Sequence, residues 1–221
     1  MEPHYTFHIE LQNLNKKLLN MTAMVEDRVR RAATVIETQD ETELQSIILS
    51  DYEIDEMEVE IEEDCLKILA LHQPVAGDLR FIITVIKINA EMERIADMAV
   101  SIAMRVVAIS KSKAKELVSN VDFSEMSEKA ITMLRMSLDA LVNRDASLAR
   151  NVFLLDDEVD NLRNEVYVTV KDIIRDNPDH PGCLINTYML ANHLERIADR
   201  ATNISEEVIY LVDGVVTRTI S

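Results

Sequence analysis

The sequence predicts an all-α protein made of two repeated three-helix bundles, with six long helices in total. Only 3 of the 221 residues are Gly and 4 are Pro, whereas 48% are hydrophobic. This composition is typical of long helices rather than of sheets with many turns. The segment Glu-Arg-Ile-Ala-Asp occurs twice, at 93–97 and at 195–199. An internal copy of this kind indicates a duplicated unit.

Apolar residues spaced three and four apart predict three helices in the first half of the chain, over about 5–38, 41–71 and 78–110. We expect Asp40 to be the N-cap of the second helix and Glu43 to complete a capping box with it. The Pro-Gly segment at 73–77 separates the second helix from the third. We expect Asp78 to cap the third helix.

The second half repeats this pattern, with helices predicted over about 124–143, 146–176 and 182–213. Gly214 follows where a C-terminal cap glycine is expected. Asp55 and Asp160 are 105 residues apart, whereas Glu93 and Glu195 are 102 apart, so the first half has three extra residues near its Pro-Gly turn. We therefore predict two repeats, residues 1–110 and 120–214, packed as one elongated unit.

The formal charge of -17 opposes binding to the phosphates of nucleic acid or to an anionic membrane surface. No apolar stretch approaches the length of a membrane span, and the first residues lack the pattern of a signal peptide. Cys65 and Cys183 stand alone, without a Cys-x-x-Cys motif, which is typical of reduced, buried thiols. These features predict a cytoplasmic protein.

Each repeat contains two acidic pairs of the form acid-x-x-x-Asp, on consecutive helices. In a helix, the two carboxylates of such a pair share one face. Counting residues from the turn places the two pairs of a repeat at nearly the same height, so four carboxylates converge if the helices are antiparallel neighbours. We predict metal binding by the following residues: Asp51, Asp55, Glu93 and Asp97 in the first repeat, and Asp156, Asp160, Glu195 and Asp199 in the second.

Clusters of carboxylate oxygens suit magnesium, manganese, calcium or iron, and zinc is less favoured without nearby His or Cys. The alternative is that these carboxylates form solvated helix faces, as most acids do in a chain with 40 of them. Helical neighbours weaken that alternative, because no Lys or Arg lies three or four positions from Asp51, Asp55, Glu93 or Glu195.

The chain lacks a Gly-rich phosphate loop, a Gly-x-Ser-x-Gly motif and a His-Glu-x-x-His motif. It also lacks the Glu-x-x-His spacing that di-iron carboxylate bundles use. We therefore expect a protein that is not an enzyme. A carboxylate-bridged metal enzyme or a metal-storage bundle is the alternative, favoured by the eight clustered acids.

The two Glu-Arg-Ile-Ala-Asp copies, together with the segment Gln-Pro-Val-Ala-Gly-Asp-Leu-Arg at 73–80, closely resemble the PhoU family. The resemblance covers nearly the whole chain. The family motif often has Gly before the final Asp, where this chain has Ala96 and Ala198. It implies cytoplasmic, all-helical homodimers that bind multinuclear metal clusters through the eight acids named above, with iron, manganese, magnesium or zinc as the metal.

The resemblance also implies a role as an adaptor that negatively regulates phosphate uptake and phosphate-starvation signalling. The partners implied are the ATPase of the phosphate ABC transporter and, in many bacteria, a sensor histidine kinase. Contact with the membrane would then occur only through these partners.

Overall fold

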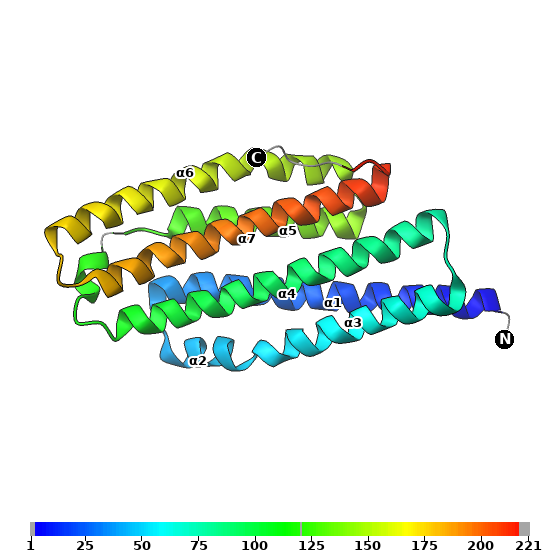
Figure 1. Ribbon diagram of the computed structural model, residues 1–221, viewed down its shortest axis with the longest axis horizontal. Helices are drawn as coiled ribbons and strands as arrows, with labels where there is room; N and C mark the ends of the chain where they lie inside the picture. Colours follow the sequence, from blue (N-terminus) through cyan, green and yellow to red (C-terminus); the bar gives the residue numbers. More distant parts are fainter. Residues whose placement is uncertain (1–2, 120, 217–221) are drawn as a thin grey trace.

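The computed structural model describes residues 3–119 and 121–216 of the chain. Residues 1, 2 and 120, which belong to the two predicted repeats, lie outside the described part, as do residues 217–221. Within this part the chain forms seven α-helices, one short 3-10 helix and no strand, so the all-α prediction is confirmed (Figure 1). The elements are α1 (Pro3–Thr38), α2 (Glu41–Leu49), α3 (Asp51–His72), α4 (Ala76–Ser110), η1 (Lys115–Val118), α5 (Ser124–Asn143), α6 (Ala146–Asp176) and α7 (Pro181–Asp213).

The long helices lie roughly side by side in an elongated bundle (Figure 1). In the first half α4 packs against α1, α2 and α3, and in the second half α7 packs against α5 and α6. The most extensive packing in the molecule joins α4 to α7, so the two three-helix units share a core. None of the helices that the structure describes is both long and apolar enough to span a membrane.

Apolar stripes on the helices produce this packing. On α1, Leu14, Leu18, Met21 and Val25 recur every three or four residues and are fully buried. Burying one such side chain stabilises a fold by about 1.5–3 kcal/mol. The long helices are therefore held by their apolar faces rather than by helix propensity alone.

Two of the predicted helix ends are confirmed. The Asp40 carboxylate accepts hydrogen bonds from the backbone N–H groups of Thr42 and Glu43, at 2.8 and 3.1 Å. Gly214 ends α7 with a φ of 73°, and its N–H donates to the carbonyl of Tyr210 at 3.0 Å. This left-handed conformation is the one that favours glycine.

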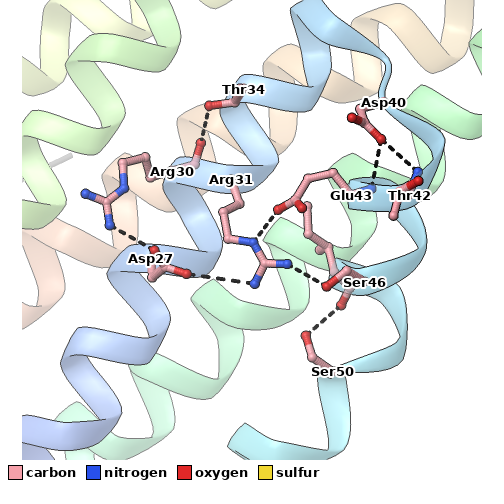
Figure 2. Close-up of polar contacts among 10 residues, drawn as sticks. Asp27, Arg30, Arg31, Thr34, Asp40, Thr42, Glu43, Ser46 and Ser50 are labelled. Carbon is pink, nitrogen blue, oxygen red and sulfur yellow. Dashed lines mark hydrogen bonds and ion pairs between the residues drawn. The ribbon is translucent and has the colours of Figure 1, made fainter.

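Two other predictions about helix starts are wrong. The Glu43 side chain does not complete a capping box, because it pairs with Arg31 of α1, which also donates to the Ser46 hydroxyl at 2.7 Å (Figure 2). Asp78 is not the cap of α4, since this helix begins at Ala76, directly after Val75. Asp78 lies in the first turn instead, where a carboxylate complements the positive end of the helix dipole.

The predicted second helix is interrupted at Ser50, which separates α2 from α3. The Ser50 carbonyl accepts from the Glu53 N–H at 3.2 Å, which closes a tighter turn than the α-helical one. Arg28 of α1 also donates to this carbonyl. The chain is thus tied to α1 at the residue before Asp51, the first of the predicted metal ligands.

Candidate metal centres

The first acidic cluster lies where the start of α3 faces the middle of α4. Oxygen atoms of Asp51, Asp55 and Asp97 all lie within 4.8 Å of one another. The fourth predicted residue, Glu93, lies one helical turn before Asp97 on α4, close enough for the charge of Asp97 to raise its pKa. The structure therefore brings three of the four predicted residues within 4.8 Å of one another and places Glu93 beside them on α4.

Repulsion within this cluster shows in the pKa values of its carboxyl groups. The pKa of Glu93 is raised to about 7, first by burial and then by the negative charge of Asp97. The pKa of Asp51 is also raised, again by burial first and then by Asp55 and Asp97. Burial without a cation disfavours the charged forms of these carboxyl groups. A bound cation would stabilise those charged forms.

The second acidic cluster lies between α6 and α7. Burial raises the pKa of Asp156 to about 6, with Asp199 and Asp160 contributing by their charge. The pKa of Glu195 is raised to about 7 by burial and by Asp199, Asp160 and Asp156. Each of the four predicted residues therefore lies close enough to another for the charge of one to raise the pKa of the other. No three of these four carboxylates, however, have oxygen atoms that all lie within 4.8 Å of one another, as three do in the first cluster.

Two arginines that the sequence did not assign to the clusters are in contact with them. Arg28, a buried residue of α1, lies 3.4 Å from a carboxylate oxygen of Asp51. Arg163 of α6 lies 3.6 Å from Glu195 and 3.8 Å from Asp160. Arg163 is three residues after Asp160, so helical spacing could have identified it, whereas Arg28 comes from a distant part of the sequence.

Glu58 is a further acidic residue of the first cluster. Its pKa is raised by burial, then by Glu62, Asp55 and Asp97. It lies one turn after Asp55 on α3, on the same acidic face. The residue 105 positions later, at the equivalent place on α6, is Arg163. The first cluster is therefore more negative than the second.

The donor set of the first cluster fits a hard cation. Ligand oxygens on opposite sides of a Ca²⁺ ion are separated by up to about 5 Å, and those of Mg²⁺ by about 4 Å. The 4.8 Å limit for Asp51, Asp55 and Asp97 allows one larger cation to contact all three. Asp55 and Asp97 are both exposed, so their side chains can rotate to suit a smaller cation.

Comparison with known proteins places both acidic clusters within matched regions. A PhoU domain family model matches residues 18–106 and 123–208. A phosphate-specific transport system accessory protein PhoU homolog from Clostridium acetobutylicum is 35% identical over 209 residues, which cover 94% of this chain and 94% of that protein.

Two crystal structures are similar to the whole bundle. PhoU from Pseudomonas aeruginosa has a TM-score of 0.85 at 32% identity, over 95% of this chain and 100% of that chain. The phosphate transport system regulatory protein PhoU from Streptococcus pneumoniae has a TM-score of 0.80 at 28% identity, over 96% of this chain and 99% of that chain.

Proposed function

This chain belongs to the PhoU family, and from that membership we propose that it is a regulatory adaptor of phosphate homeostasis. It lowers phosphate uptake and the starvation response when phosphate is ample, through contacts with the ATPase of the phosphate ABC transporter and, where one exists, a sensor histidine kinase. The observation that carries this proposal is the match of both repeats to the family. The names of the relatives, an accessory protein and a regulatory protein, support an adaptor rather than an enzyme.

The proposal includes metal binding by the two acidic clusters. Asp51, Asp55, Glu93 and Asp97 would hold metal in the first repeat. The second set would be Asp156, Asp160, Glu195 and Asp199. The metal would supply positive charge that neutralises these carboxylates and ties α3 to α4 and α6 to α7. Iron, manganese and magnesium suit this donor set better than zinc.

The metal proposal is tested by replacing Asp97 and Asp199 with Asn. This change keeps the size of both side chains and removes one anionic ligand from each cluster. We expect the double variant to lose bound metal in elemental analysis and to lose the metal-dependent gain in melting temperature. That gain corresponds to about 2.7 kcal/mol when free metal is a hundred times its dissociation constant.

A matched control replaces Asp139 and Asp179, two exposed aspartates outside the clusters, with Asn. The control should bind as much metal as the wild type, and all three proteins should have the same helical circular dichroism spectrum. If the wild type binds no divalent or trivalent metal above background, or if D97N/D199N binds as much as the wild type, the clusters are solvated helix faces.

The adaptor role is tested in cells. Deleting the gene should derepress phosphate uptake and starvation-gene expression, and affinity purification from phosphate-replete cells should recover the transporter ATPase. The eight clustered acids also favour a second candidate, a carboxylate-bridged metal enzyme. Aerobic turnover of added ferrous iron by the pure protein, with no change in phosphate uptake on deletion, would support that candidate and reject the adaptor.

A further inference from the structure

A cavity of about 600 Å³ lies at the end of the bundle opposite the short η1 segment. It is lined by the N-terminal part of α1, the first turns of α4, the residue that follows α5 and the last turn of α7. These elements gather at the right-hand end of the molecule in Figure 1. The segment 73–80, by which the chain resembles its family, runs into the first turns of α4, and the acidic clusters do not involve it.

The cavity is lined by three cationic side chains, Lys16, Arg80 and Arg144. None of the three forms an ion pair with a carboxylate in the described part of the chain. The neighbouring Lys17, in contrast, pairs with Glu60 at 3.2 Å and with Asp64 at 2.8 Å. In a protein with 40 acids and 23 bases, these three side chains bring a local excess of positive charge to one cavity.

Aromatic rings rather than carboxylates hold the two guanidinium groups. The Cζ atom of Arg80 lies 5.9 Å from the centre of the Tyr210 ring, and that of Arg144 lies 5.8 Å from the centre of the Phe81 ring. A cation–π contact positions a guanidinium without neutralising its charge. Neither guanidinium donates a hydrogen bond to any described residue, so their N–H groups remain available to a ligand.

The backbone around the cavity supports these positions. Arg144 has a φ of 51° at the C-cap of α5, a left-handed conformation in which Gly is the usual residue. Arg80 packs against Gly214 so closely that a Cβ atom there would lie 2.6 Å from its Nη1 atom. The negative, C-terminal end of the α7 helix dipole lies near Arg80 and offsets only about half a unit of its positive charge.

The remaining polar groups of the cavity also suit an anion. Gln12 and Asn15 contribute amide groups, which can donate hydrogen bonds. Among the described residues of the lining, Asp78 is the one carboxylate, so the three cations outnumber it. The N-terminal turn of α4, at Gly77, adds its positive partial charge.

We propose that this cavity binds a phosphoryl group, either as inorganic phosphate or as a small phosphate ester. Two guanidinium groups match the oxygens of a phosphoryl group through paired N–H donors, and the lysine adds a third positive charge. The cavity volume accommodates the ester as well as the free ion. This site is separate from the acidic clusters and does not rest on the adaptor role proposed above.

The test measures binding of inorganic phosphate to the full-length protein by calorimetry at low ionic strength, after a chelator has removed metal. We expect saturable binding with one phosphate per chain. Arg80→Gln and Arg144→Gln should each weaken it by about tenfold or more, because each removes a charged donor. Lys16→Gln, a change at an exposed side chain that leaves the core intact, should weaken it several-fold, whereas Asp78→Asn should strengthen it.

The control is Arg175→Gln, which removes a positive charge at the C-terminal end of α6, away from the cavity, and should leave the affinity unchanged. Glycerol phosphate serves as the ester, and whichever compound binds more tightly identifies the source of the phosphoryl group. The proposal is overturned if neither compound binds saturably, if Lys16→Gln and Arg144→Gln both bind like the wild type, or if acetate competes as well as phosphate. Because metal has been removed, none of these results bears on the metal proposal.

Discussion

Glu195 is a carboxyl group whose surroundings keep it protonated close to neutral pH. Its side chain is 15% exposed, and burial followed by the charge of Asp199 raises its pKa to about 7, although Arg163 acts in the opposite direction. Glu93 has the same pKa in the first cluster. Each cluster of the metal-free protein therefore contains a carboxyl group that is partly protonated near neutrality, and a metal ion that binds there displaces that proton.

This proton makes the stability of the metal-free protein depend on pH. The pKa of Glu195 is higher in the folded protein than its ordinary value of 4.5. The stability that its protonation contributes to the fold is therefore complete below pH 4.5 and is lost as pH rises towards 7. We predict that Glu195→Gln removes part of this loss. In a chelator at pH 8 the variant should be more stable than the wild type by on the order of 1–2 kcal/mol.

Urea unfolding at pH 5 and pH 8 measures this effect. Glu165→Gln, a change at an exposed glutamate of α6, is the control and should follow the wild type at both values. Equal stability of Glu195→Gln and wild type at pH 8 would show that the Glu195 carboxyl group is not destabilised in the metal-free fold.

Helices α3 and α6 occupy equivalent places in the two repeats but differ in charge and continuity. Spacing along the sequence was sufficient to predict the acid pairs on both helices and the N-cap Asp40. The break at Ser50 was not predicted from the apolar spacing, and Arg28, which donates to the Ser50 carbonyl, reaches it from another helix. No equivalent break interrupts α6, which is continuous from Ala146 to Asp176.

Glu58 of α3 and Arg163 of α6 occupy equivalent positions and carry opposite charges. Arg163 already lies near Glu195 and Asp160, so a metal ion in the second cluster must bind against its positive charge. We predict that Arg163→Gln tightens metal binding there by about tenfold, the effect expected when one close charge is removed. The measurement is a metal titration in an Asp97→Asn background, in which the first cluster is weakened.

The reciprocal variant, Glu58→Arg, places the same positive charge in the first cluster and should weaken its binding, measured in an Asp199→Asn background. Arg175→Gln, on the same helix as Arg163 but near its C-terminal end, controls for the loss of a charge. Unchanged affinity in Arg163→Gln would mean that the guanidinium moves aside at no cost, and that the two clusters differ for another reason.

The two repeats are joined in one molecule through α4 and α7, and a polar contact lies within that interface. Glu91 of α4 is 9% exposed and accepts hydrogen bonds from Arg200 and Asn203 of α7, at 3.3 and 3.4 Å. It also accepts one from Arg94 at 2.7 Å. The residue 102 positions after Glu91 is His193, so the duplication does not repeat this contact. A symmetric fold is thus joined by an asymmetric interface.

We predict that Glu91→Gln lowers the free energy of unfolding by about 1–3 kcal/mol, because it leaves the partly buried Arg200 without its charged partner. Lys87→Gln breaks a more exposed ion pair of the same two helices, with Glu207, and should cost less than about 1 kcal/mol. Urea unfolding followed by circular dichroism and thermal unfolding followed by calorimetry should each show one transition in both variants, since α4 and α7 share a core. A Glu91→Gln protein that is as stable as Lys87→Gln would show that this contact adds little to the interface. Two separate transitions in the wild type would show instead that the repeats unfold independently and that α4 and α7 do not couple them.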